Sequence, residues 1–203
     1  MIVVVEGVSA AGKTAWASRF APAVIDEITG QPLDSNDVAA AARYWADRHC
    51  ERWQIGLELE CNHEAVCFDT DPLKIHYSWC LWQIGINSRE AWLANALATR
   101  ERIAQKQLGF ADLIVLLEPA EDVVRQQKLN DTTRRRGNFE MHLRLAAPLR
   151  RWYTLLENLS PNRVFFNAQQ VQELPTMKMR ADRYSLELFD SLINAANHPQ
   201  SMT

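Results

Sequence analysis

The chain has 203 residues, of which 47% are hydrophobic, and a formal net charge of −3. These values predict one soluble α/β domain over residues 1–203 with a sizeable core, and the acidic balance argues against a nucleic-acid surface. The four cysteines match no zinc spacing and no apolar run is long enough to span a bilayer, so we expect a cytoplasmic protein with free thiols and no membrane partner.

The first predicted element is a β-branched strand over residues 2–5, followed by a glycine-rich loop and a helix over 15–20. The loop reads Gly7-Val8-Ser9-Ala10-Ala11-Gly12-Lys13-Thr14 and fits G-x-x-x-x-G-K-[ST], the phosphate-binding P-loop. We expect the backbone N–H groups of this loop to bind the phosphates of ATP, Lys13 to contact the β- and γ-phosphates, and the Thr14 hydroxyl to ligate Mg²⁺.

Two acidic residues, Asp26 and Glu27, follow a second short strand over residues 23–25. Open parallel sheets bind ligands beyond the carboxyl ends of their strands, so we predict that these carboxylates contact the substrate. A solvated loop is the alternative.

A long helix is predicted over residues 38–60, because this segment has good helix formers and no proline. Three of its aromatic residues, Tyr44, Trp45 and Trp53, could stack on a planar ligand, and we take Trp53 as a substrate-binding residue. A contact inside the core is the alternative for each of them.

A third strand over residues 65–68 runs into Asp69-Thr70-Asp71-Pro72. In a P-loop protein, a carboxylate at such a strand end suits Mg²⁺, and a second carboxylate can accept a proton from the attacking group. We therefore predict that Asp69 binds the metal and that Asp69 or Asp71 acts in catalysis. The alternative is a turn with two capping aspartates before the next helix.

That next helix is predicted around residues 74–84, and three of its side chains are candidates for the acceptor pocket. They are Lys74, His76 and Tyr77. Each of these residues alone is a weak signal.

Three consecutive arginines, Arg134, Arg135 and Arg136, lie in a loop that contains glycine and asparagine. Arginine binds phosphate oxygens through two parallel hydrogen bonds, so we predict a lid over about 129–140 that closes over ATP. A solvated basic loop is the alternative.

The remaining elements complete an alternating α/β pattern. We expect a helix over 89–108 closed by Gly109, a strand over 112–118, a helix over 120–128, a helix over 139–156 broken at Pro148, a strand over 163–168, an adenine-contacting loop over 169–175 and a helix over 181–195.

The order of these motifs resembles the nucleoside and nucleotide kinase group of P-loop folds, which includes deoxynucleoside kinases and thymidylate kinases. Glu6-Gly7 is similar to the Glu-Gly opening of that group's P-loop, Asp69 and Asp26 or Glu27 match its acidic strand ends, and Arg125 with the three lid arginines matches its lid. The resemblance implies a three-layer P-loop fold with a five-stranded parallel sheet in the order 2-3-1-4-5 and helices on both faces.

One departure from that group concerns the acceptor. Deoxynucleoside kinases carry an arginine directly after the acid of the third strand, whereas this chain has Asp69-Thr70-Asp71. This string is closer to P-loop proteins that resemble nicotinamide riboside kinases and antibiotic phosphotransferases.

The sequence therefore predicts an ATP- and Mg²⁺-dependent phosphotransferase whose acceptor is a nucleoside, a nucleotide or a nucleoside-like compound. An antibiotic or another metabolite as acceptor, an NTP hydrolase or switch with a protein partner, a non-catalytic nucleotide-binding module and a kinase for nucleic-acid ends are the alternatives. No Asn-Lys-x-Asp element typical of a GTPase is present. The proton acceptor among the four carboxylates stays open, and a homodimer is expected only by analogy with such folds.

Overall fold

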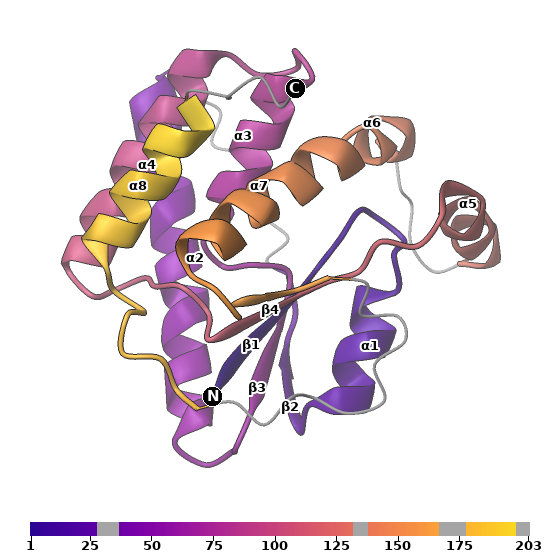
Figure 1. Ribbon diagram of the computed structural model, residues 1–203, viewed down its shortest axis with the longest axis horizontal. Coiled ribbons are helices and arrows are strands. Elements are labelled where there is room, and N and C mark those ends of the chain that lie inside the picture. The colour runs from indigo at the N-terminus through magenta and orange to yellow at the C-terminus, as the bar shows by residue number, and fades with distance from the viewer. Residues whose placement is uncertain (28–36, 132–137, 167–177, 198–203) are drawn as a thin grey trace.

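A computed structural model describes residues 1–27, 37–131, 138–166 and 178–197 (Figure 1). Within these residues a five-stranded sheet has the order β2-β3-β1-β4-β5, and every neighbouring pair of strands is parallel. The predicted strand order is therefore confirmed. The strands are β1 (Ile2–Glu6), β2 (Ala23–Ile25), β3 (Val66–Asp69), β4 (Leu113–Leu116) and β5 (Val164–Phe165).

The register of the central strands brings the site residues to one edge of the sheet. Val5 of β1 lies opposite Asp69 of β3, and Glu6 lies opposite Leu116 of β4. Because all strands run in the same direction, the segments that follow β1, β2 and β3 leave the sheet at this carboxyl edge.

Alternation along β1 divides the core between the two faces of the sheet. Val3 and Val5 pack with Trp16 of α1 (Lys13–Phe20) on one face. Ile2 and Val4 belong to a larger cluster on the other face. This second face is covered by α2 (Val38–Glu60), α3 (Ile75–Gln83), α4 (Arg89–Ala104), α7 (Ala146–Leu159) and α8 (Leu186–Asn197) (Figure 1).

The helix α2 has the predicted bounds and packs unusually close to the sheet. Asp37 caps its first turn by accepting hydrogen bonds from the backbone N–H groups of Ala39 and Ala40. A Cβ atom at Gly56 would lie 2.3 Å from Cζ of Phe68, so only glycine permits this approach of the helix to β3.

Some predicted bounds differ from the structure; the last helix, for example, begins at Leu186 rather than at residue 181. The segment 139–156 forms two helices, α6 (Phe139–Leu143) and α7, and the break comes at residues 144–145 rather than at Pro148. Proline has no N–H for the carbonyl four residues before it, so the chain breaks one turn ahead and Pro148 sits in the first turn of α7.

The helix α4 also ends earlier than predicted, at Ala104, and Lys106 rather than Gly109 takes the left-handed conformation. Gly109 is needed for a different reason, because a Cβ atom there would lie 2.9 Å from the carbonyl oxygen of Arg183.

The opposite, amino edge of the sheet holds a group of paired charges, which we call the amino-edge cluster and which consists of Met1, Glu60, Asp112 and Arg183. The Met1 ammonium lies 2.8 Å from a Glu60 carboxylate oxygen, and Arg183 binds both Glu60 and the fully buried Asp112. The second oxygen of Asp112 accepts from the N–H of Ile2 at 2.8 Å.

No helix in the described parts of the chain is both long and apolar enough to cross a membrane.

Candidate active site

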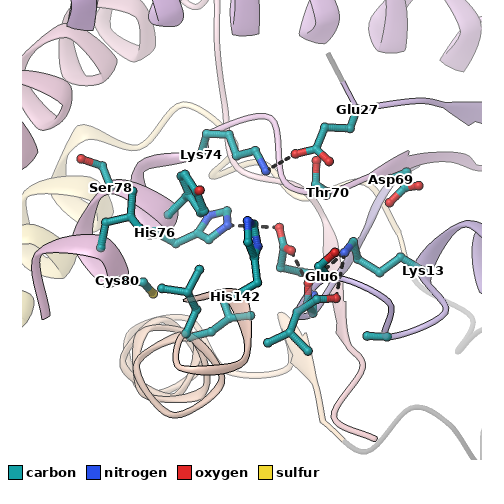
Figure 2. Close-up of a pocket in the computed structure, with 18 of the residues that line it drawn as sticks. Glu6, Lys13, Glu27, Asp69, Thr70, Lys74, His76, Ser78, Cys80 and His142 are labelled. Atoms are coloured by element: carbon teal, nitrogen blue, oxygen red, sulfur yellow. Dashed lines mark hydrogen bonds and ion pairs between the residues drawn. The ribbon is translucent and has the colours of Figure 1, made fainter. Parts of the chain in front are cut away.

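A cavity of about 1000 Å³ opens at the carboxyl edge of the sheet (Figure 2). All eight residues of the predicted P-loop line it, together with side chains from the ends of β2 and β3 and from α2, α3 and α4. The cavity therefore joins segments that lie far apart in the sequence.

The P-loop has the backbone geometry that its glycines predict. Gly7 has φ +151° and a Cβ atom there would lie 2.6 Å from the carbonyl oxygen of Leu117, while Gly12 has φ +86° at the start of α1. Lys13 Nζ donates hydrogen bonds to the carbonyls of Gly7 at 2.9 Å and Val8 at 3.2 Å. The lysine ammonium is thus held over the loop at the amino end of α1, an arrangement suited to phosphate groups.

The Thr14 hydroxyl donates a hydrogen bond of 2.6 Å to Oδ2 of Asp69, which is 55 residues away in the chain. The two side chains offer only oxygen ligands, which are the ligands that Mg²⁺ prefers. Within the described ranges no group of three or more His, Cys, Asp or Glu residues could hold a metal ion. Because Mg²⁺ beside phosphates needs only one or two protein ligands, the Thr14–Asp69 pair is a sufficient donor set.

Glu27 and Lys74 form an ion pair of 2.6 Å at the wall of the cavity. Burial alone would raise the pKa of Glu27, but the ammonium and the hydrogen bond of Lys74 hold it below its usual value. Lys74 also lies over the ring of Tyr77, with 5.4 Å between Nζ and the ring centroid. Glu27 is therefore an ionised carboxylate at neutral pH that faces the cavity.

A buried carboxylate, Glu6, ties the P-loop to the loop after β3. Its Oε1 accepts from the N–H of Gly7 at 3.0 Å, and its Oε2 accepts from the N–H of Asp71 at 3.0 Å and lies 3.1 Å from Nε2 of His76 (Figure 2). Burial would raise the pKa of Glu6, but the charge and hydrogen bond of His76, with two nearby lysines, hold it far below its usual value. Glu6 is not among the site residues predicted from the sequence. A charged residue at the end of a buried strand is the signal that could have identified it.

The predicted catalytic residue Asp71 lies behind the cavity wall rather than in it. Only 2% of it is exposed, and it is absent from the lining. Its Oδ1 accepts from the N–H of Leu73 at 2.9 Å and its Oδ2 from the hydroxyl of Tyr153 at 3.1 Å. Burial raises the pKa of Asp71. Asp71 matches the alternative of a turn with capping aspartates, because both of its carboxylate oxygens accept hydrogen bonds within the protein.

The predicted substrate-binding residue Trp53 is also placed elsewhere. It has no exposed surface and stacks on Phe68 in the core, with 6.0 Å between ring centroids. Trp45 lines the cavity instead, together with His49 one turn further along α2. Eight residues of helix span about 12 Å, so Trp45 lies beyond the sheet edge where Trp53 still lies over the sheet.

His49 contributes a neutral polar group to this wall. Burial lowers the pKa of its imidazole to about 3, so the ring carries one hydrogen-bond donor and one acceptor at neutral pH. Its buried Nδ1 atom has no hydrogen-bond partner among the described residues. The ring stacks beside Trp45, with 6.3 Å between centroids.

No protein-family model matches the sequence, and no curated protein is found as a relative. Solved structures do match over nearly the whole chain. A deoxyadenosine kinase from M. mycoides with the products dCMP and dCDP bound is 12% identical, covers 97% of this chain and 99% of its own, and gives a TM-score of 0.52. A thymidylate kinase from Candida albicans is 13% identical, covers 97% of this chain and 92% of its own, and also gives 0.52.

The chain has the fold of these nucleoside and nucleotide kinases. In this kinase fold the predicted residues Lys13, Thr14, Glu27, Asp69 and Lys74 share the cavity. His76 and Tyr77 line it as well. Asp26 does not line it, although its backbone carbonyl accepts a hydrogen bond from Arg52.

The kinase fold also depends on Arg52, which the sequence did not single out. Its guanidinium donates to the carbonyls of Asp26 at 2.8 Å, Thr70 at 2.9 Å, Ile25 at 3.1 Å and Asp69. One buried side chain of α2 thereby binds the ends of both β2 and β3.

The three lid arginines and the adenine-contacting loop lie outside the described residues. Arg125, which the resemblance grouped with the lid, binds Glu121 and Glu140 and connects α5 (Glu121–Asn130) to α6. Gln127 and Asp131 from this part of the chain line the cavity.

Proposed function

We propose that the protein is an ATP- and Mg²⁺-dependent phosphotransferase that moves the γ-phosphate to a hydroxyl or phosphate group of a nucleoside, a nucleotide or a nucleoside-like small molecule. The observation that carries this proposal is the convergence of Lys13, the Thr14–Asp69 pair and the ionised Glu27 on one cavity. The kinase fold supports it, because the M. mycoides and Candida albicans proteins of the same fold are nucleoside and nucleotide kinases.

The phosphate end of the cavity supplies charge and orientation. Lys13 exchanges its bonds to loop carbonyls for bonds to the β- and γ-phosphates, while the P-loop N–H groups bind the phosphate oxygens. Thr14 and Asp69 would hold Mg²⁺, which when bound neutralises charge on the phosphates. The lid arginines, if they close as the sequence predicts, add charge and exclude water.

Glu27 is the carboxylate best suited to take the acceptor proton. Among the four candidates, Asp26 and Asp71 do not line the cavity and Asp69 is bound by Thr14. As the acceptor oxygen bonds to the γ-phosphorus, its proton passes to Glu27 and the bond to the β–γ bridging oxygen breaks, which releases ADP. Lys74 holds the Glu27 carboxylate in place during this step.

The acceptor end of the cavity is suited to a planar molecule with polar edges. Trp45 and Tyr77 supply aromatic surface, while His49 and Asn95 supply neutral hydrogen-bonding groups. The deoxyadenosine kinase of the same fold has been solved with dATP and with dCTP bound. A nucleobase is therefore the planar group that we propose for this wall.

The test is product analysis by mass spectrometry after incubation with Mg²⁺ and ATP. The acceptors are the four deoxynucleosides, the four ribonucleosides, all their 5′-monophosphates and puromycin as a nucleoside antibiotic. A phosphorylated product is expected from at least one of them. ATP consumption that is the same with and without every acceptor would contradict the proposal and favour the hydrolase alternative.

Two neighbouring carboxylates provide a matched pair of variants. Glu27→Gln should lower kcat at least tenfold, because the proton acceptor is lost, while Asp26→Asn should leave kcat within twofold. An equal fall in kcat in both variants would contradict the proposed role of Glu27 as proton acceptor.

A further inference from the structure

Thr70 has a backbone conformation that a β-branched residue rarely adopts. Its φ is +78°, in the left-handed region. The surrounding structure enforces this conformation, because the Thr70 N–H donates to the carbonyl of Val5 at 3.0 Å and its own carbonyl accepts from Arg52 at 2.9 Å. Such strained positions are concentrated at ligand sites.

The Thr70 side chain has an unused polar atom at the cavity. The residue is 2% exposed and lines the cavity, and its buried Oγ1 has no hydrogen-bond partner among the described residues. Figure 2 shows Thr70 just below Glu27, with Asp69 to its right. A buried hydroxyl without a partner loses free energy that a bound ligand can restore, so this atom is placed to meet one.

The charges around Thr70 favour a neutral ligand group over an anionic one. Glu27 and Asp69, which Figure 2 shows near Thr70, are carboxylates. The lysines that line the cavity within the described ranges are Lys13, on the P-loop, and Lys74, which Glu27 already binds. Lys13 is proposed to bind the ATP phosphates, and the nearby Arg52 guanidinium is bonded to backbone carbonyls. A phosphate group carried by the acceptor beside Thr70 would therefore face two carboxylates, with the cations of those ranges already engaged.

We infer that Thr70 binds the hydroxyl of the acceptor next to Glu27 and Asp69, and that the accepting group is therefore an alcohol rather than a phosphate. This inference rests on the proposed function. Thr70 Oγ1 donates its hydrogen to the acceptor oxygen, whose own hydrogen points to Glu27. The oxygen then bonds to the γ-phosphorus as the β–γ bridging bond breaks, and its proton passes to Glu27. Thr70 thus selects among nucleosides and nucleotides in favour of the former.

The experiment compares each deoxynucleoside with its own 5′-monophosphate, in wild-type protein and in three variants at position 70. Wild type should phosphorylate at least one deoxynucleoside at ten times or more the rate of its monophosphate. Thr70→Val keeps the shape but removes the hydroxyl, and should lower kcat/KM for that deoxynucleoside about tenfold to a hundredfold while KM for ATP changes less than twofold. Thr70→Ser should recover most of this loss.

The third variant, Thr70→Gly, separates function from folding. Relief of the left-handed backbone offsets the lost methyl contacts, so its melting temperature should stay within about 3 °C of wild type while its kcat/KM falls like that of Thr70→Val. Full kcat/KM in either the valine or the glycine variant would overturn the inference. A rise in KM for ATP as large as the fall in kcat/KM would indicate a general structural role for Thr70 and would also overturn the inference.

The two levels of the proposal fail in different ways. Preferred phosphorylation of a monophosphate would overturn the role of Thr70 and leave the phosphotransferase proposal intact. Absence of any phosphorylated product from wild type would overturn both.

Discussion

The two edges of the sheet both bury charged groups, but they use them differently. At the amino edge, Asp112 accepts from Arg183 and from the backbone of Ile2, and Glu60 binds both Arg183 and the Met1 ammonium. Each of these charges meets an opposite charge within the protein. The charges of this edge are therefore used to hold the fold together.

The carboxyl edge combines strained backbone with unsatisfied side-chain atoms on the wall of a cavity. Of the five non-glycine residues with positive φ in the described ranges, Ala10, Thr70 and Lys74 line it, and two of the seven buried polar atoms without partners there, Thr70 Oγ1 and His49 Nδ1, belong to residues of its lining. Strain and unpaired polar groups cost free energy, so their presence together at one cavity indicates where a ligand completes the structure. The comparison separates charges that serve stability from charges that serve binding.

The largest effect is expected at the carboxyl edge, from Lys13→Ala. Loss of the ammonium at the phosphates should lower kcat a hundredfold to a thousandfold, while the free energy of unfolding stays unchanged because Lys13 bonds only to loop carbonyls. Steady-state ADP release and urea unfolding measure the two quantities. Lys106→Ala, which changes an exposed lysine, is the control, and near-normal turnover in Lys13→Ala would refute the assignment.

The converse is expected at the amino edge, from Arg183→Met. Removing this guanidinium leaves Asp112 buried without its cation, which should cost about 3 kcal/mol of unfolding free energy. The kcat should not change at temperatures where the variant is folded. Arg100→Met, which breaks an exposed ion pair with Asp190, should cost much less. A drop in kcat without a drop in unfolding free energy would contradict the assignment of the amino edge to stability and of the carboxyl edge to binding.

A smaller effect is expected behind the cavity wall, from Tyr153→Phe. The hydroxyl donates to Asp71 and lies 3.4 Å from Nδ1 of His76, so its removal leaves buried polar atoms unpaired. We expect a loss of about 1–2 kcal/mol in urea unfolding, with KM for ATP unchanged. An unchanged stability would mean that Asp71 finds another partner.

The smallest effect concerns the pH dependence of stability at the amino edge. Burial would raise the pKa of Glu60, but Arg183 and the Met1 ammonium hold it below its usual value of 4.5. The folded state therefore binds this proton more weakly than the unfolded chain, so the stabilisation is complete above pH 4.5 and is lost as the pH falls below it. Unfolding free energies between about pH 3 and 7 should fall less steeply at the acid end in Glu60→Gln than in wild type.

The phosphate end of the site could be predicted because its signals are local or follow from strand order. The P-loop is one continuous motif, and the pairing of Thr14 with Asp69 follows once β1 and β3 are neighbours. Strand ends at the same edge of a parallel sheet must converge, whatever the packing of the helices.

The acceptor end could not be predicted to the same extent because it depends on how helices pack. Whether Trp45 or Trp53 lines the cavity depends on the position of α2 over the sheet, and Gly56 permits this position by leaving room for the ring of Phe68. Asp71 is held away from the cavity, unlike Asp69, because it accepts a hydrogen bond from Tyr153 of α7. Tyr153 lies 82 residues further along the chain. Neither contact leaves a pattern within the local sequence.

The bonds of Arg52 have a mechanical consequence. One planar guanidinium joins α2 to the ends of β2 and β3, so we expect the cavity wall that carries Trp45 to keep a constant distance from the strand ends that carry Asp69. A ligand held between these two surfaces would then be selected by its thickness.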